Sequence, residues 1–280
     1  FLVMPGGGIA TRGLTCSNYW RAVEVKLRRA GAECDGGHVP EAILCWGNDN
    51  WGHWFFQFLM RLTLVADSQF AQMPVLVSRD VPARFLEWLP RLGFHNIVQA
   101  DEWVTVDRLW VPSVVTYRGH YEDYNCYVSA SAVHTMRERL TAREGRFKKN
   151  VFVSRGHATW RNILNEDELI SALGDDWDVL CMEDLTVEEQ ISAITHAEKI
   201  IMSAGASGSI TMLAPKNCQI IELIQPKLMS TFGPASWAYI VGQSYTRMDG
   251  VPKVLPKGER KEIDWDYTID VGKVMQAINA

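Results

Sequence analysis

Short apolar runs alternate with amphipathic helical patterns along this sequence, and the alternation occurs twice. The runs are AILCW (42–46), PVLVS (74–78) and RLWVPS (108–113) in the first half, and VFVS (151–154), WDVLCM (177–182), KIIMS (199–203) and QIIELI (219–224) in the second. Because a helix between two strands carries the chain back to start a parallel strand, this order is typical of doubly wound sheets. We therefore predict an α/β fold with two consecutive Rossmann-like units.

A charged segment, REGRFKKN (143–150), separates the two halves. A charged stretch that contains glycine suits a linker between domains. We place an N-terminal domain at 1–145 and a C-terminal domain at 146–280, which ends in a helix after the tail IDWDYTIDVG. Thr186 and Glu189 match a capping box and predict where one helix of the second domain begins.

Composition argues against three classes of protein. The formal net charge is −5 and the 28 Lys and Arg residues are scattered, so no basic surface for nucleic acid is indicated. The six Cys residues form no C-x-x-C pair, which favours reduced core thiols over disulfides or zinc ligands. No apolar run approaches the roughly 20 residues that span a bilayer. We expect a soluble, cytoplasmic protein without a membrane span.

Small residues in SAGASGSITML (203–213) follow a predicted strand and precede a helical pattern. Such a turn lets the backbone approach an anion, and the free N–H groups of a helix start favour negative charge. A diphosphate would fit there, with contacts from Gly205, Ser207, Gly208 and Ser209. Tight packing alone explains such a turn equally well, because the pattern is not G-x-G-x-x-G.

Two arginines flank the end of the first strand in the second half. Arg155 leaves the strand and Arg161 lies six residues later, with His157 between them as a further expected contact to the phosphate. A guanidinium group binds phosphate oxygens through two hydrogen bonds and stays charged. Glu222 lies near the end of a later strand, where a carboxylate can accept hydrogen bonds from ribose hydroxyls. The alternative for each residue taken singly is an ordinary solvated side chain.

The stretch WGNDNWGHWFF (46–56) mixes five aromatic residues with four polar ones. Aromatic rings on this scale are expected to be buried, whereas the polar groups between them are costly to bury without partners. Asp175, Asp176 and Asp178 imitate the D-x-D of metal-dependent sugar transferases, but they precede a strand instead of ending one. A turn is the simpler account, and the histidines show no metal-ligand spacing such as H-E-x-x-H.

Taken in order, these pieces resemble glycosyltransferase family 61. The motifs are N-x-x-H-W, S-R-x(5)-R-x-I-x-N-E-x-E-L, L-T-x-x-E-Q-I, a Gly/Ser turn with I-T-M-L, and I-I-E-L. The resemblance runs from about Trp46 to Tyr245 and is strongest over 151–224. It implies two Rossmann-like domains facing across a cleft (the GT-B arrangement), with the donor nucleotide in the C-terminal domain. It also implies inversion at the sugar carbon without a bound metal.

The same resemblance implies the substrates. Its members include xylosyltransferases, O-linked N-acetylglucosaminyltransferases and capsular polysaccharide enzymes. The expected donor is a UDP-sugar, UDP-xylose first and UDP-N-acetylglucosamine second, and the expected acceptor is a glycan or glycoprotein hydroxyl. No further cofactor is expected.

Two positions depart from the family pattern. The glycine turn of the family commonly reads G-P-H-G-A-G-L-T-N, and its His is Ala206 here. The acidic residue that commonly lies four positions after the His of N-x-x-H-W is Gln57 here. One diphosphate contact and one carboxylate base are therefore missing.

These departures leave His53 as the expected general base, since an imidazole changes its charge near neutral pH and can accept the proton of the attacking hydroxyl. Asp49 is the rival base, and Asn50 and Trp51 are expected to contact the sugar. The alternative is that Asn48, Asp49 or Asn50 caps a helix and His53 only braces it. A non-catalytic nucleotide-sugar or glycan-binding module on the same fold also stays open. A Rossmann epimerase is weaker, because Y-x-x-x-K and G-x-x-G-x-x-G are absent.

Overall fold

A computed structural model gives the fold of the chain, which divides into two compact units, Phe1–Val115 and Thr116–Ala280. Three short N-terminal strands are described at 2–3, 9–11 and 14–16, and beyond them residues 37–100, 104–118, 126–142, 145–156, 158–227, 233–256, 259 and 261–280.

The second unit contains a five-stranded sheet in which every strand is parallel to its neighbours. In spatial order its strands are β11 (Trp177–Cys181), β10 (Asn150–Ser154), β12 (Lys199–Ser203), β13 (Gln219–Ile224) and β14 (Ser244–Asp249). Counted from β10 along the chain, this is the order 2-1-3-4-5 of a doubly wound fold. The strand order therefore reverses between β10 and β12, which is where ligands of such folds bind.

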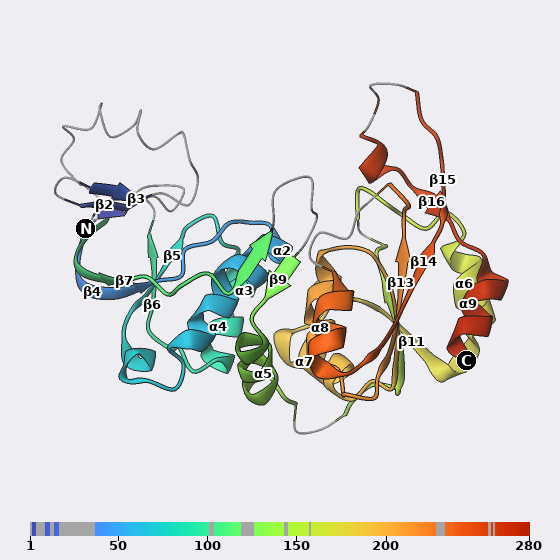
Figure 1. The fold of residues 1–280 in the computed structure, drawn as a ribbon, viewed down its shortest axis with the longest axis horizontal. Helices are drawn as coiled ribbons and strands as arrows, with labels where there is room; N and C mark the ends of the chain where they lie inside the picture. Colours follow the sequence, from blue (N-terminus) through green and yellow to red (C-terminus); the bar gives the residue numbers. More distant parts are fainter. Residues whose placement is uncertain are drawn as a thin grey trace. The chain divides into compact units, whose positions relative to one another are not determined.

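Helices cover both faces of this sheet, as Figure 1 shows. One face carries α6 (Glu166–Leu173) and α9 (Val271–Ile278), and the other carries α7 (Val187–Thr195) and α8 (Pro234–Val241). The side chains under α6 and α9 form a single apolar core that includes Phe152, Ile201 and Ile221 of the strands. The predicted C-terminal helix is thus confirmed, and it completes this core.

The first unit contains a seven-stranded sheet whose parallel part has four strands. The parallel strands are, in spatial order, β7 (Val104–Trp110), β4 (His38–Leu44), β5 (Val75–Ser78) and β6 (Ile97–Ala100). The strands β1 (Leu2–Val3), β2 (Ile9–Thr11) and β3 (Leu14–Cys16) extend it antiparallel beyond β7. Parallel sheets in both units confirm the predicted α/β class, while the arrangement of the two units across a cleft stays a prediction.

The helical segments of the first unit are short. A continuous helical stretch follows β4 and consists of α2 (Trp51–His53), the π-helix η1 (Trp54–Phe58) and the 3-10 helix η2 (Leu59–Leu64). The remaining ones are η3 (Gln69–Gln72), α3 (Ala83–Leu86) and α4 (Trp88–Arg91). The smaller elements of the second unit are β8 (Thr116–Arg118), β9 (Cys126–Val128), α5 (Ala130–Arg139), η4 (Gly174–Asp176), η5 (Met182–Asp184), η6 (Ala206–Leu213), β15 (Val251–Pro252), η7 (Glu262–Asp264) and β16 (Tyr267–Thr268).

The second unit begins at Thr116 and not at residue 146, where the charged segment places the boundary. The reason is α5, which packs against α8 and the 3-10 helix η6. The Arg137 guanidinium also donates hydrogen bonds to the carbonyl oxygens of Met212 and Ala214, the latter at 2.6 Å. The polar helix that precedes the charged segment therefore belongs to the second unit.

Two local predictions are confirmed. Thr186 and Glu189 form the reciprocal hydrogen bonds of a capping box at the start of α7. Gly174, Asp175 and Asp176 form a 3-10 turn before β11. Cys45, Cys181 and Cys218 are free thiols, and burial raises the pKa of the Cys45 and Cys218 thiols to about 12. Among the described residues no helix is long and apolar enough to cross a bilayer.

Candidate functional site

Arg155 and Gly205 meet at the reversal point of the second sheet. Arg155 follows β10, and Gly205 lies two residues beyond β12, so both lie at the carboxyl ends of neighbouring parallel strands. Nη1 of Arg155 donates to the carbonyl oxygen of Ala204 at 3.4 Å, and Nη2 donates to that of Trp160 at 3.1 Å. The two sequence-predicted elements, the arginine and the glycine turn, are thus brought together.

Arg161 lies close enough to Arg155 for their charges to interact. The pKa of the Arg155 guanidinium is lowered, first by burial and then by the positive charge of Arg161. Within the part of the chain that the structure describes, neither guanidinium forms an ion pair, and the Nε atom of each is buried without a hydrogen-bond partner. Two neighbouring, partly exposed guanidinium groups are suited to an anion with several oxygens, such as a diphosphate.

The turn after β12 leads into η6, which is a 3-10 helix beginning at Ala206. Ser207 is half-buried, and its hydroxyl has no hydrogen-bond partner among the described residues. The hydroxyl of Ser209 is used internally, since it donates to the carbonyl oxygen of Ala206 at 2.5 Å. Gly208 is buried, and a Cβ there would lie 3.0 Å from the sulfur of Met202. Of the four predicted turn residues, Gly205 lies against Arg155, and the Ser207 hydroxyl is free among the described residues. Gly208 and Ser209 are buried and stabilise the turn.

Glu222 has a partner inside the protein. It lies two residues before the end of β13, is 2% exposed, and accepts a hydrogen bond of 2.6 Å from the hydroxyl of Tyr245. Burial raises the pKa of its carboxyl group, against the opposing effects of Tyr245 and Arg247. A ribose contact from Glu222 would require Tyr245 to move. His157, the other predicted contact, lies outside the described residues.

In the first unit, two polar residues of the turn that follows β4 accept hydrogen bonds from the backbone. Oδ1 of Asn48 accepts the N–H of Asn50 at 3.0 Å, and Oδ1 of Asn50 accepts the N–H of His53 at 3.1 Å. Asn50 therefore caps the helical stretch. Asp49 and His53 are exposed, and neither side chain has a hydrogen-bond partner among the described residues.

The backbone before this cap is unusual. Trp46 is buried with φ at 62°, a left-handed conformation that a residue with a Cβ rarely adopts. Gly47 follows with φ at 132°, and a Cβ on it would lie 2.5 Å from the Trp54 ring. Backbone strain of this kind clusters at functional sites, and Asp49 and Asn50, which follow it, are exposed.

The aromatic residues of the same stretch are packed together. The Trp51 ring lies 5.1–5.8 Å from the rings of Trp54, Phe55, Phe85 and Trp88, measured between ring centroids. Trp54 and Phe55 are completely buried, whereas Trp51 is half-buried. The rings fill the space beneath the helical stretch, and the side chains of Asp49 and His53 are exposed.

Lys148 forms hydrogen bonds with the acidic run at the start of β11, whose first strand residues are Trp177 and Asp178. The backbone N–H of Lys148 donates to Oδ2 of Asp178 at 2.7 Å, and its Nζ donates to the carbonyl oxygen of Asp175 at 2.6 Å. Among the residues for which coordinates are described, no three His, Cys, Asp or Glu side chains are grouped as metal ligands.

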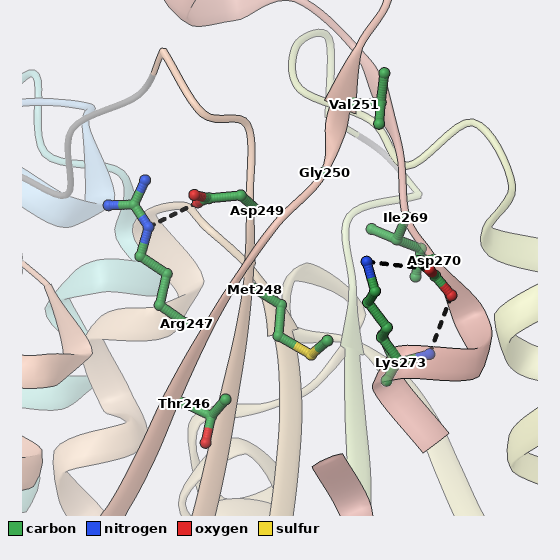
Figure 2. A pocket seen from close by; sticks show the side chains of 10 residues that line it. Thr246, Arg247, Met248, Asp249, Gly250, Val251, Ile269, Asp270 and Lys273 are labelled. Atoms are coloured by element: carbon green, nitrogen blue, oxygen red, sulfur yellow. Dashed lines mark hydrogen bonds and ion pairs between the residues drawn. The ribbon is translucent and has the colours of Figure 1, made fainter. Parts of the chain in front are cut away.

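Figure 2 shows a pocket of about 450 Å³ at the β14 edge of the second sheet. Two ion pairs line it, Arg247 with Asp249 at 2.8 Å and Lys273 with Asp270 at 3.5 Å. None of the residues predicted from the sequence lines this pocket. Because its charges are already paired within the protein, it offers no selective contact for an anion.

Several polar residues around Arg155 escaped the sequence analysis. The Ser154 hydroxyl donates to Oε1 of Glu166 at 2.5 Å, and the Ser203 hydroxyl pairs with that of Tyr267 at 2.6 Å. Each serine is the last residue of a strand, and this position in the sequence could have identified both as site residues. Tyr267 is distant in sequence, and only the run DWDY (264–267) marks it.

Comparison with known protein families matches residues 51–221, more than half of the chain, to the family described as Glycosyltransferase 61. A comparison with curated proteins finds no match.

Proposed function

The chain belongs to glycosyltransferase family 61, and from this premise we propose that it transfers a sugar from a UDP-sugar to a hydroxyl group of a glycan or glycoprotein. Membership of the family makes the chain a glycosyltransferase. The nucleotide, the sugar, the acceptor and the stereochemistry are parts of the proposal.

The observation that carries the proposal is the pair of guanidinium groups at the reversal point of the second sheet. Arg155 is fixed there by the carbonyl oxygens of Ala204 and Trp160, and Arg161 adds a second positive charge. A diphosphate leaving group develops negative charge as the sugar departs, and fixed positive groups at that position stabilise the transition state. The free Ser207 hydroxyl is a further donor for the same anion.

The proposed mechanism is a direct, inverting displacement. A base removes the proton of the acceptor hydroxyl as its oxygen attacks the sugar carbon, the bond to the diphosphate breaks, and UDP leaves with the bonding electron pair. We assign the base to His53, with Asp49 as the alternative, because both side chains are exposed and unpaired among the described residues. Asn50 fixes the backbone of His53 through its cap. Charge stabilisation by the two arginines replaces a divalent metal in this scheme.

A donor assay tests the proposal. The purified chain is incubated with UDP-xylose and with UDP-N-acetylglucosamine, and free UDP is measured with and without candidate glycan acceptors. Many transferases slowly pass the sugar to water, so UDP release without acceptor is the expected minimum signal. A chain that binds UDP but releases none from either UDP-sugar, with or without acceptor, overturns the two proposed donors. Xylose is the preferred donor sugar because the family resemblance favours it.

A further inference from the structure

The C-terminal segment Glu262–Ile269 lies outside the region that the family comparison matches, yet it is hydrogen-bonded to the loop that carries both arginines. Oδ1 of Asp266 accepts the N–H of Asn162 at 2.8 Å. The carbonyl oxygen of Asp264 accepts the N–H of Arg161 at 3.3 Å, and the N–H of Tyr267 donates to the carbonyl oxygen of Asn162 at 3.0 Å. The segment therefore binds the backbone on both sides of the Arg161 side chain.

Arg161 needs such support. Its φ is 61°, a left-handed conformation that brings the Cβ of an L-residue close to the carbonyl oxygen. A residue stays in this region only when its surroundings determine it. Arg161 and Asn162 form this bend, and their N–H groups donate to oxygens of Asp264 and Asp266, which hold the bend in place.

The same segment also supports the other side of the anion site. Tyr267 is 1% exposed, and its hydroxyl contacts the Ser203 hydroxyl at 2.6 Å and donates to the carbonyl oxygen of Leu223 at 2.9 Å. Ser203 is the last residue of β12, directly before the turn that contains Gly205. One segment thus connects the arginine loop with the strand end opposite it.

The approach of this segment depends on a glycine. A Cβ on Gly250 would lie 2.3 Å from Cδ2 of Tyr267 and 2.6 Å from the carbonyl oxygen of Thr268. Asp266 is itself held there, since its carbonyl oxygen accepts the N–H of Lys253 at 2.8 Å. The carboxylate of Asp266 is consequently aimed at the arginine loop from a fixed backbone.

We propose that Asp266 is a positioning residue for the anion site: it holds the Arg161 loop in its left-handed bend, so that both guanidinium groups are in place before the donor arrives. Two like charges repel, as the effect of Arg161 on Arg155 shows, and an unsupported loop relaxes by moving Arg161 away. The C-terminal segment is then a part of the donor site. This inference rests on the proposed function in so far as the anion is the diphosphate of a UDP-sugar.

The test measures the affinity for UDP and for inorganic pyrophosphate by calorimetry. Asp266→Ala leaves the N–H of Asn162 without its acceptor and should weaken the binding of both probes by about tenfold. Asp266→Asn keeps an oxygen acceptor and should bind close to the unaltered protein. In the Arg161→Ala background, Asp266→Ala should cause little additional loss, because Asp266 acts through Arg161.

Asp270→Ala is the matched control. Asp270 lies in the same part of the chain, caps α9 and pairs with Lys273 (Figure 2), but no hydrogen bond joins it to the described residues of the arginine loop. This variant should lower the melting temperature and leave the affinity for UDP unchanged. If Asp266→Ala does not fold, Asp266→Glu, which displaces the carboxylate by one methylene, is measured with the same expectation of weaker binding.

The outcomes separate this inference from the proposed function. Unchanged UDP affinity in a folded Asp266→Ala protein overturns the inference and leaves the proposed function standing. Pyrophosphate binding that depends on Asp266, without any binding of UDP, supports the inference and overturns the proposed nucleotide. A chain that binds neither probe overturns both.

Discussion

Gly205 and Arg155 are so close that a Cβ on Gly205 would lie 1.7 Å from Nη1 of Arg155. The φ of Gly205 is 174°, which any residue adopts, so the requirement for glycine is one of space and not of backbone conformation. The side chain that needs this space is the one that holds the proposed diphosphate.

Gly205→Ala should therefore impair binding more than folding. The Arg155 side chain can swing away at small cost in stability, but it then loses its hydrogen bond to Ala204, and UDP affinity should fall by about tenfold. Calorimetry and a melting curve check the two effects separately. Gly272→Ala is the control, because Gly272 lies within α9 and a Cβ there meets only an ordinary contact. That variant should leave UDP affinity unaltered and raise helix stability by up to about 1 kcal/mol.

Removal of divalent metal should leave sugar transfer intact. The charge of the leaving diphosphate is matched by Arg155 and Arg161, and Asp178 of the acidic run is bonded to Lys148. Transfer rates measured in EDTA, and again after manganese or magnesium is added back, check this expectation. Activity that vanishes in EDTA and returns with metal would contradict the proposed mechanism.

His53→Ala should lower the turnover number by about 10²- to 10⁴-fold, the usual contribution of a positioned base, and leave UDP affinity nearly intact. Asn50→Ala is the structural comparison, since it removes the cap that accepts the N–H of His53 and should cost about 1 kcal/mol of stability. A normal turnover number in His53→Ala together with an inactive Asp49→Asn would transfer the role of base to Asp49.

Glu222 should make the stability of the protein depend on pH. Its pKa is raised in the folded state by burial, so the folded protein binds the proton more tightly than the unfolded chain. The stability that the folded protein gains from this tighter proton binding is complete below about pH 4, the ordinary pKa of Glu. It is lost as pH rises through the folded-state pKa. Glu222→Gln should thus melt higher than the unaltered protein at pH 7, with the difference shrinking toward pH 4. A difference that grows on acidification would show that Tyr245 and Arg247 outweigh burial.

The sequence predicted the meeting of Arg155 with the glycine turn because both follow strands, and the ends of neighbouring parallel strands share one edge of a sheet. The strand β14 was not predicted, since its sequence SYTRMD carries no apolar run. It lies at the edge of the sheet with most of its side chains partly or fully exposed, so burial left no pattern to detect.

Long-range contacts explain the other gaps. Asn162 and Asp266 are 104 residues apart, and no local periodicity links them. The burial of Glu222 beside Tyr245 could not be predicted either. The sequence pattern around a carboxylate near a strand end is the same whether the side chain faces solvent or a neighbouring strand. The aromatic cluster around Trp51, in contrast, followed from composition, since that many rings have to be buried.

The most direct test of the account is the calorimetric affinity of the chain for UDP before and after removal of each arginine. We predict that the unaltered chain binds UDP and that Arg155→Ala and Arg161→Ala each weaken binding by about 1.5–3 kcal/mol, the scale of a hydrogen bond to a charged group. Arg137→Ala provides the matched control, because the hydrogen bonds of its guanidinium within the described part of the chain go to the carbonyl oxygens of Met212 and Ala214. It should cost stability and spare UDP affinity. Unchanged affinity in both site variants would contradict the assignment of the donor to the reversal point between β10 and β12.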